Sequence, residues 1–222
     1  MQAKTFIRMS GLGGQGVVTA AHILGSAAVR SGLLSTVNPF FGAEKRLAPA
    51  ESYVRISSQT IHERGEVLFP DIIMIFHPHV ITLGKSYTMP FFDGLQKQGK
   101  IIINAPEPLP LNESERAQLA ALNARLYYIS ATRLALEIAG TELSSNIAML
   151  GALIAVTDLV SQQALEEALA ERFGGTKKFV ASGTTAALDD VLKSKFTKLA
   201  QLMDKNIALI EQAKSSIQEH VI

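Results

Sequence analysis

The 222-residue sequence contains no cysteine and no tryptophan, and it has no long uninterrupted hydrophobic run. Without cysteine the chain has no disulfide, thiolate nucleophile, cysteine-ligated zinc site or ordinary iron–sulfur cluster. Its most apolar stretch, residues 147–156, is about half as long as the roughly 20 residues of a membrane-spanning helix. The first residues show no secretory segment. We therefore expect a cytoplasmic chain that enters no membrane.

An excess of charge of one sign is also lacking. The 21 Lys and Arg residues oppose 20 Asp and Glu residues, which gives a formal net charge of +1. No overall field then attracts nucleic acid or an anionic membrane, so neither is expected as a partner. The hydrophobic content of 47% is ample for one core, and the length suits one ordinary domain.

Apolar segments alternate along the chain in the pattern of an α/β protein. Residues 4–9 form an apolar strand that leads into the glycine-rich segment 10–16, and helical spacing follows from 17 to 28. A short strand at 33–37, with Gly32 at the expected end of the helix, completes a βαβ unit. This unit favours a parallel sheet.

The remaining segments continue the alternation. Apolar runs at 72–76 and 100–104 indicate central strands covered on both faces. The alternating segment 51–57 suits an antiparallel or edge strand, and 38–49 is expected to be a loop. Further predicted elements are a helix at 113–123 capped by Asn112, a strand at 125–129, and helices at 132–139, at 144–156 and from 161 to Gly174-Gly175.

Together these elements predict an α/β fold with a Rossmann-like, mostly parallel sheet, helices on both faces and a long C-terminal helical tail. The expected domain is 1–188, followed by an amphipathic helical extension at 189–222 that runs to the end of the chain. A lone helix of that length would leave its apolar side in water. It must therefore dock on this domain or on another subunit.

The segment Gly11-Leu-Gly-Gly-Gln-Gly16 satisfies the dinucleotide-binding pattern G-x-G-x-x-G between a strand and a helix. Glycines let backbone amides approach a phosphate, and the start of a helix favours negative charge. A structural turn without a ligand gives the same pattern. An NAD site also has an acidic residue about 20 residues further on, whereas none precedes Glu44 here. The sequence therefore favours another phosphate-bearing ligand, or a protein contact, over NAD.

Two other polar groups follow or begin apolar segments. His77 and His79 come directly after a central strand, but no third metal ligand is near them in sequence, so no metal site is expected. Asn146 opens an apolar helix and is expected to cap it.

Five segments together resemble the gamma subunit of 2-oxoacid:acceptor oxidoreductases, whose best-known member acts on pyruvate and reduces ferredoxin. In the family's order they are Gly11-Leu-Gly-Gly-Gln-Gly-Val-Val-Thr-Ala-Ala21, Asn38-Pro-Phe-Phe-Gly-Ala-Glu-Lys-Arg46, Tyr53-Val-Arg-Ile-Ser57, Pro70-Asp71 and Asn146-Ile-Ala-Met-Leu-Gly151. The chain departs from the family at Leu47, where a glycine is common after the basic pair.

The resemblance implies an assembly that decarboxylates a 2-oxoacid, such as pyruvate or phenylglyoxylate, and transfers the acyl group to coenzyme A. Thiamine diphosphate with Mg²⁺ would lie on alpha- and beta-type subunits, and [4Fe-4S] clusters on a ferredoxin-like delta-type subunit. The lack of cysteine and of a thiamine-diphosphate signature in this chain agrees with that division. The gamma chain would contribute no catalytic residue and would be inactive alone, but it would bind coenzyme A and pack against its partners.

Within this resemblance, the phosphates of coenzyme A would contact the amides of the glycine loop and nearby cations. The candidate residues are Gly11, Gly13, Gly14, Gln15, Gly16, Lys45, Arg46 and Arg55. Two alternatives remain open: a stand-alone nucleotide-binding oxidoreductase, and a structural scaffold whose glycine turn contacts only protein.

Overall fold

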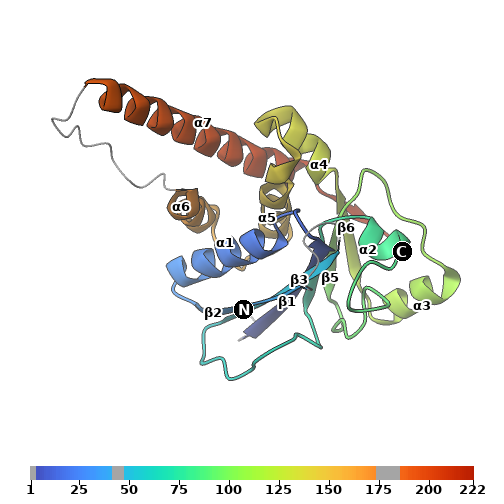
Figure 1. The fold of residues 1–222 in the computed structure, drawn as a ribbon. Coiled ribbons are helices and arrows are strands. Elements are labelled where there is room, and N and C mark those ends of the chain that lie inside the picture. Colours follow the sequence, from blue (N-terminus) through green and yellow to red (C-terminus); the bar gives the residue numbers. More distant parts are fainter. Residues whose placement is uncertain (1–3, 42–47, 174–185) are drawn as a thin grey trace.

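The computed structural model describes residues 4–41, 48–173 and 186–222 (Figure 1). They contain a seven-stranded sheet in the order β2-β3-β1-β4-β5-β6-β7. The strands are β1 (Lys4–Leu12), β2 (Leu34–Phe41), β3 (Pro49–Ser57), β4 (Ile72–Ile75), β5 (Lys100–Asn104), β6 (Arg125–Ile129) and β7 (Gln218–His220). The helices are α1 (Val17–Arg30), α2 (His79–Thr82), α3 (Glu113–Ala121), α4 (Ala131–Leu134), the π-helix η1 (Ala135–Ala139), the 3-10 helix η2 (Glu142–Ser144), α5 (Ser145–Val156), α6 (Gln162–Phe173) and α7 (Ala186–Ser216).

Most strands of the sheet run in one direction. β1, β4, β5 and β6 pair in parallel, and β2 shares their direction because both β1 and β2 are antiparallel to β3. β7 runs the opposite way beside β6. The predicted α/β fold with a mostly parallel sheet is therefore confirmed. β3 is antiparallel, as predicted for 51–57, but it lies between β1 and β2, so the edge position belongs to β2.

Two strands differ from the sequence prediction. β2 continues through Asn38 and Pro39 to Phe41, where a loop was predicted. Proline lacks an N–H, but an edge strand tolerates it because one side of the strand needs no partner. The C-terminal helix ends at Ser216 instead of running to the chain end, and 218–220 pair with β6.

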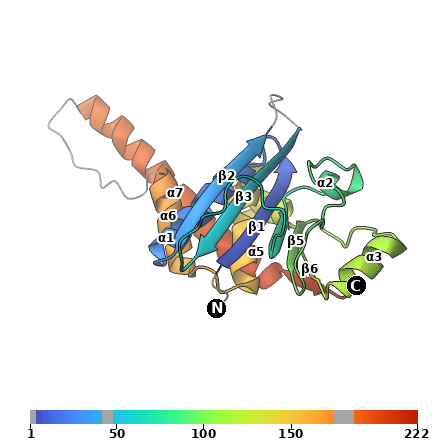
Figure 2. The same cartoon turned by 90° about the horizontal axis from the view of Figure 1, so that it is seen from below.

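Helices lie on both faces of the sheet, as predicted, and they form two apolar cores with it where the sequence suggested one. Ile7, Met74 and Ile102 pack with α1, α5, α6 and the C-terminal part of α7 in the first core. Ile73 and Ile101, one position away on their strands, point to the second core with residues of α2 and α3. Figure 2 shows β2, β3 and β1 in front of the helices of the first core.

The C-terminal helix docks on its own domain. At Gly151 of α5 an added Cβ would lie 2.9 Å from both the Ala213 Cβ and the Ile210 carbonyl oxygen of α7. Only glycine permits so close an approach of the two helices. Leu209, Ile210 and Ala213 are fully buried there. The C-terminal half of α7 is therefore part of the core. Of the two docking partners that the sequence left open, this half packs on its own domain.

A buried polar cluster lies on the second face of the sheet, beneath β1 and β3. Arg8 is 2% exposed, and its guanidinium donates to the carbonyl oxygens of Phe91 and Asp93, each at 2.9 Å. Glu51 has no exposed surface, and its carboxylate accepts from the Tyr53 hydroxyl at 2.8 Å. Burial lowers the pKa of Arg8, while Glu51 acts in the opposite direction. Glu51 therefore offsets part of the cost of burying the Arg8 charge.

The carboxylate of Glu51 also fixes the connection between α2 and β5. It accepts from the Ser86 hydroxyl at 2.8 Å and from the Tyr87 amide at 3.2 Å. The Tyr87 ring packs edge-on against Phe40 of β2, with centroids 4.8 Å apart. Through these contacts the second face of β2, β3 and β1 holds the segment that follows α2.

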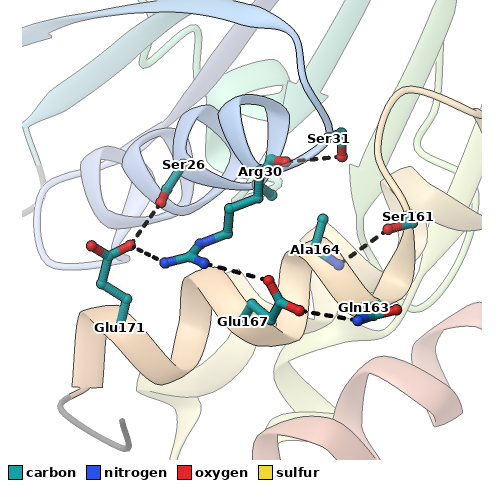
Figure 3. Close-up of polar contacts among 9 residues, drawn as sticks. Ser26, Arg30, Ser31, Ser161, Gln163, Ala164, Glu167 and Glu171 are labelled. Carbon is teal, nitrogen blue, oxygen red and sulfur yellow. Dashed lines mark hydrogen bonds and ion pairs between the residues drawn. The ribbon is translucent and has the colours of Figure 1, made fainter. Parts of the chain in front are cut away.

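Ion pairs join α1 to α6 at the surface (Figure 3). Arg30 contacts Glu171 at 2.8 Å and Glu167 at 3.4 Å, and the Ser26 hydroxyl donates to Glu171 at 3.1 Å. At the start of α6 the Ala164 amide donates to the Ser161 hydroxyl, so Ser161 caps this helix. The hydrogen bonds from Arg30 and Ser26 lower the pKa of Glu171 below its ordinary value of 4.5.

Replacing Arg30 should produce a small, pH-dependent loss of stability. A carboxyl whose pKa is lowered in the folded state stabilises the protein above its ordinary pKa, and this contribution disappears as the pH falls through the lowered value. The thermal midpoint of Arg30→Gln should therefore lie slightly below that of the original chain at pH 7, and the difference should shrink below pH 4.5. Thermal scans from pH 7 to 3 test this. Arg172→Gln, an exposed residue of α6, is the control, and an equal effect there would contradict the prediction.

Among the helices in the described ranges, none combines the length and apolar character that a bilayer span requires.

Candidate functional site

The glycine turn between β1 and α1 is held by its own hydrogen bonds. The Gly13 amide donates to the Ala48 carbonyl oxygen at 2.8 Å, and the Gln15 amide donates to that of Leu12 at 3.2 Å. The Gln15 side-chain oxygen in turn accepts from the Leu12 amide at 3.0 Å. Gly11 is buried within β1, where an added Cβ would lie 2.7 Å from Val17. Gly11 therefore allows the close packing of β1 against α1, while Gly13 and Gln15 fix the shape of the turn through their hydrogen bonds.

A row of amides at the start of α1 lacks partners. The N–H groups of Gly14, Gly16, Val17 and Val18 make no hydrogen bond with the described residues. The N-cap position is Gly16, which offers no side chain, and the first turn of α1 contains no acidic residue. Free amides and the helix dipole together favour an anion at such a place.

Gly16 joins this turn to α5. Its φ of +71° is in the left-handed region, and its carbonyl oxygen accepts from Asn146 Nδ2 at 3.3 Å. An added Cβ at Gly16 would overlap the Asn146 amide, with the Asn146 Cγ only 3.0 Å away. Asn146 was predicted to cap its helix, but the N-cap of α5 is Ser144. Asn146 instead braces the glycine turn, 130 residues away in sequence.

A cavity of about 670 Å³ opens beside the turn. Its lining consists of Gly13, Gly14, Gln15, His77, Thr132, Glu142, Leu143 and Ser145. It lies where β1 and β4 end, at the carboxyl edge of the parallel strands, which is the edge where α/β proteins bind ligands. Its volume falls within the range of small-molecule sites. We take this cavity, together with the free amides, as the candidate site.

Two further clefts in the described parts of the chain lie away from the glycine turn. One of about 720 Å³ lies at the opposite, amino-terminal edge of β4 and β5 and is lined by both cations and acids, among them Lys97, Arg125, Asp71 and Asp158. The other holds only about 170 Å³, beside Tyr128 and His220. Neither includes residues of the glycine turn.

Asn104 links the ends of neighbouring strands beside the cavity through its side-chain hydrogen bonds. Its amide nitrogen donates to the Phe76 carbonyl oxygen at 3.0 Å and to the Thr132 hydroxyl at 2.9 Å. The Phe76 amide donates to the Ser10 carbonyl oxygen at 2.8 Å. The ends of β1, β4 and β5 and the start of α4 are thus tied together. Sequence reasoning missed Asn104, although a polar residue that ends a buried apolar strand was a usable signal.

His77 and His79 lie against each other at the rim. Their ring centroids are 4.4 Å apart, and the His79 amide donates to His77 Nδ1 at 3.1 Å. Burial lowers the pKa of His77 below 6.5, with smaller contributions from His79 and Lys85. In the described ranges, no three His, Asp, Glu or Cys residues are grouped as metal ligands would be.

The structure does not bring Arg55 to the glycine turn. Arg55 is 2% exposed, and its guanidinium donates to Asn38 Oδ1 and to the carbonyl oxygens of residues 64–66. Its neighbours Val54 and Ile56 pack toward α1, so the Arg55 side chain points to the other face of the sheet. Arg55 therefore anchors the loop at 64–66, and the prediction that it contacts the ligand phosphates is not supported. Lys45 and Arg46 lie outside the described residues.

Comparison with known proteins identifies the family. Residues 6–189 match the family model described as pyruvate ferredoxin/flavodoxin oxidoreductase. The common gamma subunit of the pyruvate/ketoisovalerate oxidoreductases of Thermococcus kodakarensis is 36% identical over 169 residues, which cover 76% of this chain and 86% of the relative. The PorC subunit of pyruvate synthase from Methanothermobacter marburgensis has the same identity and coverage.

Solved structures share the fold. The PORC subunit of pyruvate oxidoreductase from Thermotoga maritima superposes with a TM-score of 0.70 at 21% identity, covering 99% of this chain and 100% of that chain. The 2-oxoglutarate:ferredoxin oxidoreductase of Magnetococcus marinus, solved with 2-oxoglutarate, coenzyme A and succinyl-CoA bound, gives 0.68 at 21% identity, covering 97% of this chain and 31% of that one. The chain therefore belongs to the pyruvate ferredoxin/flavodoxin oxidoreductase family and corresponds to its gamma-type subunit, as the sequence motifs predicted.

Proposed function

We propose that this chain serves a multi-subunit 2-oxoacid:acceptor oxidoreductase by binding coenzyme A at the glycine turn. The observation that carries the proposal is the row of free amides at Gly14, Gly16, Val17 and Val18, which lies beside a cavity of about 670 Å³. Coenzyme A presents a diphosphate and a 3′-phosphate, and amide donors form strong, charge-assisted hydrogen bonds with such groups. No acidic residue in the first turn of α1 opposes them.

Charge within the cavity favours one orientation of the ligand. Glu142 is the one acid among the lining residues. Because like charges repel, the phosphates belong at the glycine turn, and the uncharged pantetheine arm belongs nearer Glu142. Lys45 and Arg46 stay in the proposal as phosphate partners, since Ala48, at the end of their segment, is hydrogen-bonded to Gly13. Arg55 leaves it because its guanidinium is already paired.

The proposal divides the reaction among several chains. Thiamine diphosphate with Mg²⁺ on alpha- and beta-type subunits supplies the carbanion chemistry of decarboxylation, and [4Fe-4S] clusters on a delta-type subunit carry the electrons. In support, this chain has no cysteine for clusters and no thiamine-diphosphate signature. Its own part is to hold the acyl acceptor and to pack against those subunits.

Purification of the tagged chain from its native host tests the proposal. We expect a brown complex several times heavier than 23.9 kDa that oxidises a 2-oxoacid with coenzyme A and a dye acceptor. The isolated chain should show no turnover. A colourless monomer without partners would refute the multi-subunit proposal, and binding of NAD(P)H by that monomer would favour the stand-alone oxidoreductase instead.

Arg46→Ala should raise the KM of the complex for coenzyme A about tenfold or more and leave the KM for the 2-oxoacid unchanged. A hydrogen bond between charged groups contributes about 1.5–3 kcal/mol, and about 1.4 kcal/mol corresponds to a tenfold change in binding. Steady-state kinetics of the purified complex measure both constants. Arg116→Ala, an exposed position on α3, is the matched control. An unchanged KM for coenzyme A in Arg46→Ala would remove that residue from the site.

A further inference from the structure

The candidate cavity contains a histidine donor that the proposed phosphate contacts leave unused. His77 lines the cavity, two residues after the end of β4. The His79 amide donates to its Nδ1, so that nitrogen is an acceptor and the neutral ring carries its proton on Nε2. Nε2 has no hydrogen-bond partner among the described residues and is not a buried unpaired atom. A donor is therefore left open to solvent on a residue of the cavity wall.

The environment keeps this imidazole uncharged at neutral pH. Burial lowers the pKa of His77 below 6.5, and the neighbouring His79 and Lys85 act in the same direction, while Glu142 opposes them. A neutral N–H donor can bind a phosphate, but unlike a cation it adds no positive charge to the site and does not need an anionic acceptor. It suits a neutral acceptor, such as the carbonyl oxygen of an amide or a thioester.

The backbone on the N-terminal side of His77 is fixed. The Phe76 amide and carbonyl are held by the Ser10 carbonyl oxygen and the Asn104 side chain, at 2.8 and 3.0 Å. After His77 the chain enters α2. The ring of His79 packs against the ring of His77, with centroids 4.4 Å apart. A donor held in this way loses little conformational freedom when it binds, which is the advantage of a preorganised site.

We propose that His77 is a ligand-binding residue whose Nε2–H donates to a carbonyl oxygen of the pantetheine arm of the bound substrate. This inference rests on the coenzyme A site proposed above. With the phosphates at the glycine turn and Glu142 on the same cavity wall, the uncharged arm is the part of the ligand that a neutral donor in this cavity can recognise.

The test uses the intact oxidoreductase complex and two ligands that share the nucleotide end. The KM for coenzyme A reports the whole molecule, whereas the inhibition constant of adenosine 3′,5′-bisphosphate reports the nucleotide without the pantetheine arm. His77→Phe should raise the KM for coenzyme A about three- to tenfold, as expected for one lost neutral hydrogen bond. The inhibition constant and the kcat at saturating coenzyme A should not change. His77→Gln, which keeps a donor, should recover part of the loss.

Gly16→Ala serves as the reference variant, since it disturbs the proposed phosphate site and should raise both constants. If it does so while His77→Phe changes neither, the role of His77 is overturned and the coenzyme A site stands. If His77→Phe raises both constants equally, His77 acts on the phosphate end or on the turn, and this inference is also overturned. If Gly16→Ala raises neither, the coenzyme A site itself fails.

Discussion

Gly16→Ala should raise the KM of the oxidoreductase complex for coenzyme A about tenfold to several hundredfold while the chain still folds and assembles. The new Cβ would overlap the Asn146 side chain, so that side chain, the turn or α5 must shift, and the hydrogen bond from Asn146 to Gly16 is disturbed. The free amides of Gly14, Gly16 and Val17, which we propose as the phosphate donors, would then be displaced. Loss of one charge-assisted hydrogen bond, at about 1.5–3 kcal/mol, gives about a ten- to hundredfold effect, and weakening of a second raises it further.

The effect of backbone strain must be separated from the effect of the overlap. A non-glycine residue in the left-handed region costs roughly 1–2 kcal/mol wherever it occurs. Gly32 has a φ of +77° and nothing within 4 Å of an added Cβ, so Gly32→Ala carries the strain without the overlap. We expect Gly32→Ala to lower the free energy of unfolding by about the cost of that strain. It should leave the KM for coenzyme A unchanged. Equal KM values in the two variants would show that the glycine turn does not bind coenzyme A.

A second variant tests the link between the two motifs. In Gly16→Ala combined with Asn146→Ala the obstructing side chain is gone, although the hydrogen bond from Asn146 to the Gly16 carbonyl is lost as well. The KM for coenzyme A should fall partway back toward that of the original complex. No recovery would show that the left-handed backbone, and not the contact with α5, determines the shape of the turn.

The order of strands and helices could be predicted because most elements carry a strong local pattern. The runs at 100–104 and 125–129 coincide with β5 and β6. Asn112 caps α3 in a reciprocal capping box with Glu115. Gly32 lies at the end of α1, as predicted, one residue after the C-cap Ser31, and its φ is positive. In each case the residues that form the element also carry the signal for it.

The features that sequence missed depend on contacts between distant segments. The sequence 51–57 indicated an antiparallel strand but not its place, because pairing with both β1 and β2 follows from tertiary packing. The strand β7 is short, and all of its side chains are exposed, so no alternation of burial marks it. Residues 135–139 have an ordinary helical composition, yet the backbone there is a π-helix. Nothing in the local sequence distinguishes these cases.

Within the site, sequence motifs identified the glycine turn and left its surroundings open. His77 and Asn104 follow or end central strands, and the carboxyl edge of the sheet brings them together. Arg55 shows the limit of the approach, because a strand places alternate side chains on opposite faces and its register decides which face the cation takes. A basic residue inside a family motif was interpreted as a ligand contact, whereas in this structure its guanidinium is hydrogen-bonded to a loop.

Arg8→Ala should lower the free energy of unfolding by about 3–5 kcal/mol, the cost typical of breaking a buried, compensated charge. The substitution would remove the donor to the Phe91 and Asp93 carbonyl oxygens and leave Glu51 buried without a nearby positive charge. For a chain of this size such a loss corresponds to a fall of roughly 6–20 °C in the thermal midpoint. Denaturant titration and thermal scans of the purified chain measure both quantities. Lys4→Ala, on the same strand, breaks only a partly exposed ion pair with Glu63 and should change the midpoint little.

A double-mutant cycle distinguishes charge compensation from simple loss of packing. Glu51→Gln keeps the shape of the side chain and an acceptor for the Tyr53 hydroxyl, and alone it should destabilise the chain because Arg8 then stays buried and uncompensated. In the background of Arg8→Met, which fills most of the vacated space, the same change should cost much less or become favourable, since it removes the remaining buried charge. A coupling energy near zero between positions 8 and 51 would contradict the interpretation that Arg8 and Glu51 offset each other's charge. The loss in Arg8→Ala would then be attributed to the cavity and to the two orphaned carbonyl oxygens.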